Sequence, residues 1–350
     1  MKSRLINKII ISLFCSVVCV TFSSCSDWTE TESLTVTDPN IEDQNPELYA
    51  QYLKNLRDYK NSHHKIVYAW FDNSRKDPFS RGQHIENLPD STDVVAFMYP
   101  DNLEEWELDE MNSVRRNKGM KIIFTLGYDA IKLNYDNMIV ASQNSESEIA
   151  GPKDFISYLA DTLQHTLKLV DKYNYDGISI GYNGKSFLHM TPKEKVEYVS
   201  NETAYIGIIT SWIAAHKDKT VVFEGMPQNL VDKTILNSCE HIIIPTANAT
   251  NSSLLTYNIA IAAVEGVPSD RFVITAETAS LNTGDTKTGY WTDGSRAIMS
   301  SAIWVSATYS GFTIAGLGIN NVNNDYYNAM RVYEYTKKAI DILNPSLKSN

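Results

Sequence analysis

Apolar, β-branched runs recur along residues 65–318, and a segment with helical spacing follows most of them. Most of these runs are apolar throughout rather than alternating, which is typical of parallel strands covered on both faces. They predict eight strands, over residues 65–71, 93–99, 121–128, 175–182, 220–226, 241–246, 271–278 and 311–318. Apolar stripes and capping residues predict helices over residues 103–118, 154–173, 191–217, 251–265, 293–309 and 325–343.

Eight strands that alternate with helices over about 280 residues predict an α/β fold, a (β/α)8 TIM barrel formed as a single domain by residues 45–350. A doubly wound open sheet is the alternative, but no glycine-rich phosphate loop follows the first strand. Between the first two strands, Pro78, Gly82 and Pro89 argue against a helix. In a TIM barrel the functional site lies at the C-terminal ends of the strands.

The first residues have a different character. Three basic residues precede a short apolar run within residues 1–24, and small residues then lead to Cys25. This pattern resembles a bacterial lipoprotein signal peptide, which implies that Cys25 is lipidated. Residues 25–44 are polar and acidic, and they predict a flexible tether. Acidic residues directly after the cysteine resemble the export signal of surface-exposed lipoproteins in Gram-negative bacteria. We therefore expect a lipid anchor in the outer membrane at the cell surface, with a periplasm-facing lipoprotein as the alternative.

Charge and cysteine usage narrow the function classes. The formal net charge is -11, from 31 Lys and Arg against 42 Asp and Glu, which argues against a nucleic-acid partner. Cys239 is the one cysteine left after the predicted signal and Cys25, so no internal disulfide is expected, and its apolar neighbours predict a buried core position. The seven histidines have no metal-ligand spacing, and neither a metal nor a cofactor is expected.

Aromatic, amide and carboxylate side chains gather at the predicted strand ends, where barrel geometry makes them converge. The candidate binding residues are Trp70, Asp72, Tyr99, Tyr128, Asp176, Tyr182, Asn183, Glu224, Glu277 and Asn320. For any single aromatic residue, and for Trp70 above all, core packing is the competing interpretation, because alternation along the strand decides which way its side chain points.

The fourth predicted strand carries the segment YDGISIGYN at residues 175–183. It resembles the DGxDxDxE motif of glycoside hydrolase family 18, the chitinases and endo-β-N-acetylglucosaminidases. On the third strand, TLGY at residues 125–128 resembles that family's SxGG segment. The resemblance covers the whole barrel and is closest to endoglycosidase-like lipoproteins that act on N-glycans. It implies a TIM barrel that receives a GlcNAc-containing oligosaccharide.

The motif departs from the family at the positions that carry the chemistry. Asp176 and Gly177 match, but Ser179, Gly181 and Asn183 replace the second Asp, the third Asp and the terminal Glu. The resemblance implies that the Glu is the general acid and that the neighbouring Asp orients the substrate's own N-acetyl group, a substrate-assisted scheme. An amide has no titratable proton to give, so Asn183 cannot act as a general acid.

Two hypotheses from different classes follow. The first is a non-catalytic surface lipoprotein that captures GlcNAc-containing, N-glycan-like ligands beside an outer-membrane glycan importer. The second is an active endo-β-N-acetylglucosaminidase-like hydrolase with displaced carboxylates, for which Glu224 and Glu277 are the candidates. A retaining pair of carboxyl groups would have to lie about 5–5.5 Å apart. A purely structural subunit of an importer is a third, weaker possibility.

Overall fold

The computed structural model describes residues 41–143 and 153–345 of the chain. The predicted signal peptide, Cys25 and the tether up to residue 40 lie outside the described residues. Packing divides the chain into two compact units with the boundary after Gln51. Helix α2 (Ile41–Gln44) belongs to the first unit, and helix α3 (Pro46–Lys60) begins in the first and ends in the second. All strands lie in the second unit.

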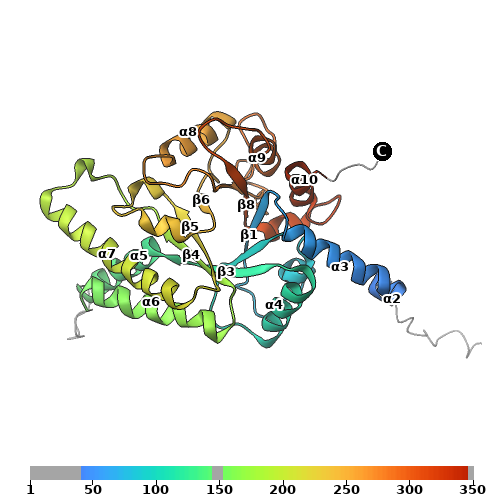
Figure 1. Ribbon diagram of the computed structural model, residues 1–350, viewed down its shortest axis with the longest axis horizontal. Coiled ribbons are helices and arrows are strands. Elements are labelled where there is room, and N and C mark those ends of the chain that lie inside the picture. The colour runs from blue at the N-terminus through green and yellow to red at the C-terminus, as the bar shows by residue number, and fades with distance from the viewer. Residues whose placement is uncertain (1–40, 144–152, 346–350) are drawn as a thin grey trace, which may run out of the picture. The chain divides into compact units, whose positions relative to one another are not determined.

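Eight parallel strands close into a barrel in the order of the sequence (Figure 1), so the predicted TIM barrel is confirmed. The strands are β1 (Ile66–Phe71), β2 (Val94–Phe97), β3 (Lys121–Gly127), β4 (Gly177–Tyr182), β5 (Thr220–Gly225), β6 (Ile242–Ile244), β7 (Phe272–Glu277) and β8 (Ile314–Asn320). Pairing of β8 with β1 closes the barrel and sets Tyr68 beside Gly318. β-Branched and aromatic residues favour these strands because their side chains pack well on a pleated surface.

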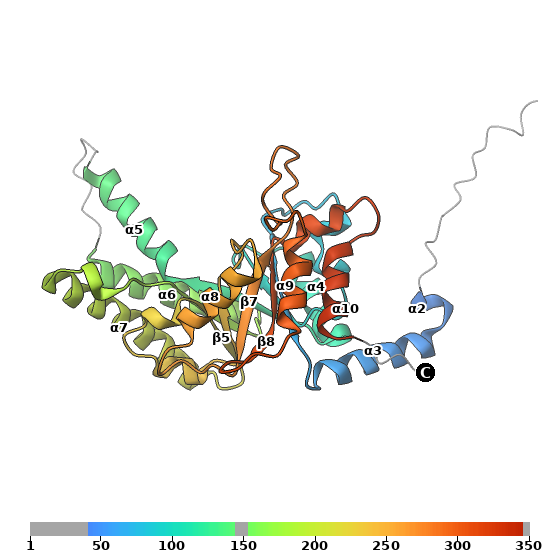
Figure 2. The same cartoon turned by 90° about the horizontal axis from the view of Figure 1, so that it is seen from above.

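Helices pack around the outside of the strands (Figures 1 and 2). They are α4 (Glu105–Lys118), α6 (Phe155–Lys172), α7 (Pro192–Ala215), α8 (Ser252–Ala262), α9 (Ala297–Val305) and α10 (Glu334–Leu343). Helix α5 (Tyr128–Gln143) follows β3 and projects away from the barrel (Figure 2). Short 3₁₀ helices lie at Arg81–Gln83, Ile85–Asn87, Phe187–His189, Pro227–Asn229, Thr234–Ser238 and Val322–Tyr327. Among the described residues, no helix is both long and apolar enough to cross a membrane.

Helix α5 differs from the sequence-based expectation. The third strand was expected to extend through Tyr128, but β3 ends at Gly127 and α5 begins at once. Only Tyr128 and Ile131 of this helix are buried. A helix without an apolar stripe gives no periodic signal, which is why the pattern did not predict it.

The last predicted helix is interrupted. Residues 322–327 form a 3₁₀ helix, and α10 begins only at Glu334, after Tyr333 in the left-handed backbone region at φ 53°. The buried carboxylate of Asp325 accepts hydrogen bonds from the backbone N–H and the hydroxyl of Thr336, both at 2.7 Å. The carboxylate thus satisfies N–H groups at the start of α10 that have no partner within the helix.

Two groups of apolar side chains stabilise the fold. The larger fills the space between strands and helices and includes the buried Cys239, as predicted. The smaller lies inside the barrel and contains Tyr68, Val94, Ala96, Ile123, Val222, Ile243 and Val273. Trp70 packs against this inner group, because it shares the inward face of β1 with Tyr68. A Cβ at Gly318 would lie 2.5 Å from the Trp70 ring, so the indole needs a glycine at that position.

Candidate functional site

The C-terminal ends of the strands form the barrel mouth, and one carboxylate lies inside it. Glu224, near the end of β5, accepts a hydrogen bond from the Thr125 hydroxyl at 2.9 Å and another from the Ser179 hydroxyl at 3.2 Å. The indole of Trp70 lies near enough to this carboxylate to lower its pKa. Strands β3, β4, β5 and β1 therefore converge on a single acidic group.

Burial raises the pKa of Glu224 above the ordinary value for glutamate, while the Thr125 and Ser179 donors and the Trp70 indole act in the opposite direction. A carboxyl group with a raised pKa can stay protonated nearer to neutral pH and can then donate a hydrogen bond or a proton. Glu277, at the end of β7, has separate partners: Asn321 Nδ2 donates to its carboxylate at 2.7 Å. Among the described residues, no hydrogen bond or ion pair joins Glu224 to Glu277.

At the third motif position there is no space for a side chain. A Cβ on Gly181 would lie 2.8 Å from Thr125 Cγ2 and 3.1 Å from the backbone oxygen of Leu126. Real Cβ atoms do not approach other carbon atoms so closely, so the Thr125 methyl group occupies the space that a carboxylate at this position would need.

The terminal motif position is turned toward helix α5. The exposed Asn183 amide donates to Asp129 Oδ2 at 2.9 Å, and the Asn183 backbone N–H donates to the same oxygen at 3.2 Å. Asn229 Nδ2 in turn donates to the Asn183 carbonyl at 2.8 Å. These contacts hold Asn183 at the edge of the mouth, where its amide is already engaged.

Asp176 lies at the opposite end of the barrel from the mouth, which corrects its sequence-based placement as a binding residue. It precedes β4, and its carboxylate accepts from Arg115 Nε at 2.9 Å and from the Ile122 N–H at 2.8 Å. The motif's first aspartate therefore connects the N-terminal ends of β3 and β4 to helix α4.

Tyr182 also lies outside the mouth, contrary to expectation. Its ring is buried between the barrel and the helices, and its hydroxyl donates to Glu202 Oε2 at 2.6 Å. Tyr182 has the opposite strand parity to Gly181, so its side chain points outward. The Tyr128 ring packs 5.1 Å from that of Tyr182 and 6.0 Å from that of Phe155, in the same outer layer.

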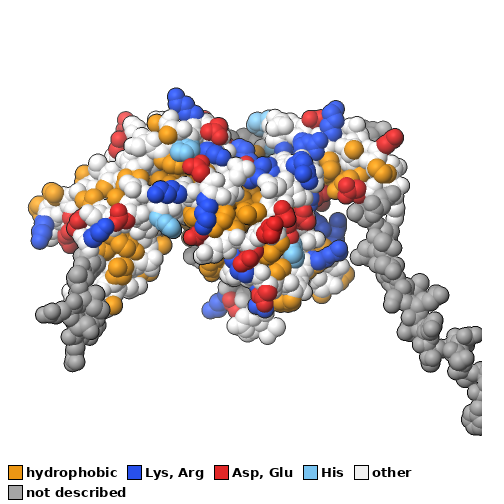
Figure 3. Space-filling view, turned by 90° about the horizontal axis from the view of Figure 1, so that it is seen from below, with side chains coloured by type: hydrophobic (Ala, Val, Ile, Leu, Met, Phe, Trp, Pro, Cys, Tyr) orange, Lys and Arg blue, Asp and Glu red, His pale blue; other side chains and the backbone are white. Residues whose placement is uncertain are grey.

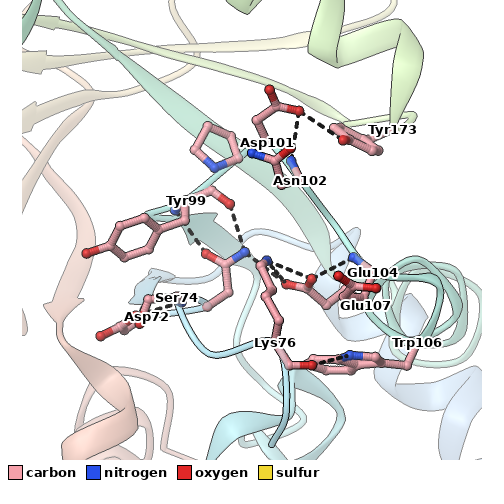
Figure 4. A network of polar contacts seen from close by, with 12 residues as sticks. Asp72, Ser74, Lys76, Tyr99, Asp101, Asn102, Glu104, Trp106, Glu107 and Tyr173 are labelled. Atoms are coloured by element: carbon pink, nitrogen blue, oxygen red, sulfur yellow. Dashed lines mark hydrogen bonds and ion pairs between the residues drawn. The ribbon is translucent and has the colours of Figure 1, made fainter.

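Asp72 and Tyr99 follow β1 and β2 at the mouth, and a buried carboxylate holds both segments in place (Figure 4). Glu107 accepts from Lys76 Nζ at 2.7 Å and from Asn73 Nδ2 at 3.0 Å. The Asn73 amide also donates to the Tyr99 carbonyl at 2.8 Å. The Tyr99 ring points away from this network and is 49% exposed, so it is available for stacking.

Next to this network, the segments after β1 and β8 enclose a hollow of about 600 Å³, here called the β8–β1 hollow. Asn323 connects the two segments, since its side chain accepts from the Asp72 N–H at 2.8 Å and donates to the Asp72 carbonyl at 3.2 Å. Asn320 ends β8 beside Glu277. The rings of Phe79 and Tyr327 line the hollow and are exposed.

Several of these residues were not among the candidates predicted from the sequence. Thr125 begins the TLGY segment at residues 125–128, and its strand parity could have placed it in the barrel. Asn321, Asn323 and Asn324 belong to the amide-rich stretch NNVNN at residues 320–324, which is a usable composition signal. Phe79 had no such signal, because it lies in a segment without strand or helix periodicity, and Tyr327 fell within the helix predicted over residues 325–343.

The face of the molecule in Figure 3 carries acidic and basic side chains interspersed with hydrophobic ones. This face therefore has no broad basic surface of the kind that binds a phosphate backbone.

Comparisons with known proteins agree with this architecture. The family model for glycoside hydrolase family 18, BT1044-like, matches residues 29–342. The fold is similar to that of a variant of BT1044, with a TM-score of 0.62 and 18% identity over 87% of this chain and 95% of that chain. It is also similar to endo-β-N-acetylglucosaminidase from Cordyceps militaris in its apo form, with a TM-score of 0.53 and 17% identity over 84% of this chain and 96% of that chain.

A mutant of the Cordyceps militaris enzyme in complex with fucosyl-N-acetylglucosamine-Asn gives a TM-score of 0.51 and 17% identity over 84% of this chain and 95% of that chain. No curated protein sequence matches the chain. At these identities the structural similarities establish the fold.

Proposed function

Since the chain belongs to glycoside hydrolase family 18, in its BT1044-like group, we propose that its barrel mouth binds a GlcNAc-containing, N-glycan-like oligosaccharide without hydrolysing it. The protein would act as a capture component of a glycan-utilisation system. A fucosyl-N-acetylglucosamine-Asn ligand is bound by the mutant fungal endo-β-N-acetylglucosaminidase, and this supports the ligand class.

The observation that carries the proposal is the pair of motif positions 181 and 183. Asn183 has no acidic proton, and its amide is held by Asp129. Position 181 has no carboxylate and no space for one beside Thr125. Substrate-assisted hydrolysis needs both a proton donor and a group that orients the N-acetyl substituent. Both roles are missing from the family positions.

The binding role is supported by the other side of the mouth. Exposed rings at Tyr99, Phe79 and Tyr327 offer apolar faces, and the asparagines of residues 320–324 offer both donors and acceptors. Carbohydrate hydroxyls and acetamido groups need this mixture, because a sugar presents apolar ring faces and polar edges.

One observation favours a second candidate, hydrolysis by a displaced acid. Glu224 lies inside the barrel at the C-terminal end of β5, and burial raises its pKa. These are the properties of a general acid. In this alternative Glu224 protonates the leaving oxygen, and Glu277 is the remaining strand-end carboxylate.

Two measurements on the same samples test both candidates. Isothermal titration calorimetry measures binding of N-glycans and chitin oligosaccharides to the full chain, and mass spectrometry then detects any hydrolysis products. Saturable binding of an intact glycan supports capture. Released oligosaccharide that disappears in Glu224→Gln establishes the alternative and overturns the non-catalytic role. Phe79→Ala should weaken binding, whereas Phe187→Ala, away from the hollow, is the control. Absence of binding to every glycan would overturn the proposal.

We also propose that Cys25 carries lipid and anchors the protein in the outer membrane, facing the cell surface, next to a glycan importer. The signal-like residues 1–24 and the acidic segment after Cys25 support this placement. Metabolic labelling with a palmitate analogue should be lost in Cys25→Ala. Protease added to intact cells should digest the protein if it faces outward, and full protection would place it on the periplasmic side.

A further inference from the structure

A second, smaller pocket of about 260 Å³ lies beside the β8–β1 hollow, between the loop after β7 and the start of α10, and it is here called the Arg296 pocket. The Arg296 guanidinium lies between two aromatic rings, 4.3 Å from the Tyr290 ring centre and 4.5 Å from the Tyr335 ring centre. Because two rings pack against the guanidinium, its N–H edge is the part left for a ligand.

The Arg296 side chain has no acceptor in the part of the chain that the structure describes: no ion pair and no hydrogen bond engages its N–H groups. The nearby acid, Asp325, is committed elsewhere. Its carboxylate accepts from Thr336 and from the Tyr335 N–H. Burial raises the pKa of Asp325, and the charge of Arg296 acts in the opposite direction more weakly. An arginine with five donors and no carboxylate partner is unusual, since partly buried guanidinium groups are normally paired.

The backbone fixes the position of this arginine. Residues Tyr290 and Arg296 form an antiparallel bridge, and the Ala297 N–H donates to the Gly289 carbonyl at 2.9 Å. Gly289 has φ 78° and packs on the backbone of Ala279, where a Cβ would lie 2.4 Å from the Ala279 nitrogen. Only glycine fits there, so the loop after β7 is held against the strand end and the guanidinium is pre-organised.

The Arg296 pocket continues into the β8–β1 hollow, because Leu281, Asn324 and Tyr327 line both. The Asn324 amide has no hydrogen bond among the described residues, and it adds neutral donors near the guanidinium. A glycan that stacks on Tyr327 could therefore extend one substituent from the hollow into the pocket.

We propose that the Arg296 pocket binds the carboxylate of an acidic sugar on the captured glycan. The planar guanidinium edge matches the two oxygens of a carboxylate in a bidentate arrangement. This inference rests on the proposed glycan-binding function and specifies its ligand: an oligosaccharide with an acidic sugar near the GlcNAc-containing portion. A sulfate ester offers similar oxygens and is distinguished in the test.

The test is a calorimetric titration of the full chain with three ligands: a biantennary N-glycan ending in sialic acid, the same glycan after removal of sialic acid, and a sulfated GlcNAc oligosaccharide. Wild type should bind the sialylated glycan roughly tenfold to a hundredfold more tightly than the neutral one, the usual range for one charge-assisted bidentate contact. Arg296→Gln should remove this difference and leave the affinity for the neutral glycan unchanged.

Two further variants serve as controls. Arg296→Lys keeps the charge and loses the planar fork, so it should retain only part of the preference. Arg116→Gln removes one charge from the exposed face of α4 and should leave the preference intact. Thermal unfolding of each variant establishes that it is folded.

The outcomes separate this inference from the proposed function. Equal affinity for the sialylated and neutral glycans overturns the carboxylate site while glycan capture stands. If only the sialylated glycan binds and this binding is lost in Arg296→Gln, the carboxylate site is supported and capture of neutral glycans is ruled out. A preference for the sulfated ligand over the sialylated one replaces carboxylate by sulfate. If the preference for the sialylated glycan survives in Arg296→Gln, other residues cause that preference and the inference is overturned.

Discussion

The two sides of the barrel mouth use their polar groups differently. On the side of β4, polar side chains are satisfied within the protein: the Asn183 amide donates to Asp129, and the Ser179 hydroxyl donates to Glu224. On the side of β8 and β1, aromatic rings are exposed, and the donors of Arg296 and Asn324 have no partner among the described residues. Free donors and exposed rings are what a ligand needs, so recognition is expected at the side of the mouth away from the catalytic motif.

This contrast also explains how a barrel can lose hydrolysis and keep ligand binding. The reaction depends on a few carboxylates at one strand end, whereas recognition depends on many weaker contacts spread over loops. In the proposed non-catalytic function, Ser179, Gly181 and Asn183 account for the missing chemistry, and the hollow on the other side does not depend on them.

The largest expected effect comes from removing the carboxylate that holds the β1 side together. Glu107→Ala leaves Lys76 and the Asn73 amide without their buried acceptor. Breaking such a buried pair costs about 3–5 kcal/mol of unfolding free energy. Urea unfolding measures this cost, and glycan affinity should fall with it. Glu105→Ala, an exposed acid on the same helix, is the matched control, and equal unfolding midpoints for the two variants would contradict the network's role.

A smaller loss is expected on the β4 side from Gly181→Asp. The new side chain meets Thr125 Cγ2, and overpacking of this kind costs about 1–3 kcal/mol. Thr125→Ser removes the methyl group and keeps the hydroxyl that donates to Glu224, so it should recover much of the loss. A double-mutant cycle by urea unfolding gives the coupling. Additive effects would mean that the two residues do not compete for space.

The third prediction concerns pH and Glu224. A carboxyl group with a raised pKa in the folded protein stabilises it most when protonated, and this stabilisation is lost as pH rises through the folded-state pKa. Unfolding free energy of wild type relative to Glu224→Gln should therefore decrease from pH 4.5 to pH 8. A flat difference across this range would show that Glu224 titrates normally.

The smallest effect is expected for Asp129→Ala, which frees the exposed Asn183 amide. Both residues are exposed, and surface substitutions usually change stability by no more than about 0.5 kcal/mol. Glycan affinity should change less than about twofold, equivalent to roughly 0.4 kcal/mol. A large loss of affinity would move the recognition surface back to the β4 side.

Much of the fold could be predicted because buried parallel strands are continuous apolar runs, and all eight were located from them. Helix α5 was not predicted because only Tyr128 and Ile131 are buried in it, and two buried residues give no periodic apolar pattern. The predicted helix over residues 325–343 was wrong in its first part, because the Asp325 carboxylate accepts from the Thr336 N–H and α10 begins only at Glu334. This contact spans 11 positions, and hydrophobic periodicity does not reveal it.

The site was harder to predict, and strand parity decides which of the candidate residues face the inside of the barrel. Trp70 and Glu224 face inward, and their strand position alone is sufficient to place them in the barrel. Tyr182 is one residue out of phase with Gly181, and Asp176 precedes its strand. The Arg296 pocket depends on a bridge between Tyr290 and Arg296 within a loop, which no pattern of the sequence encodes.

The position of Trp70 has an optical consequence. Its indole lies over Gly318 and near the Glu224 carboxylate, so protonation of that acid changes its surroundings. Indole emission shifts and changes intensity with local polarity and charge. The chain has six tryptophans, and the difference between wild type and Trp70→Phe isolates the signal of this one. The barrel thus contains an intrinsic fluorescent probe of the protonation of Glu224, one that needs no label and no catalytic turnover.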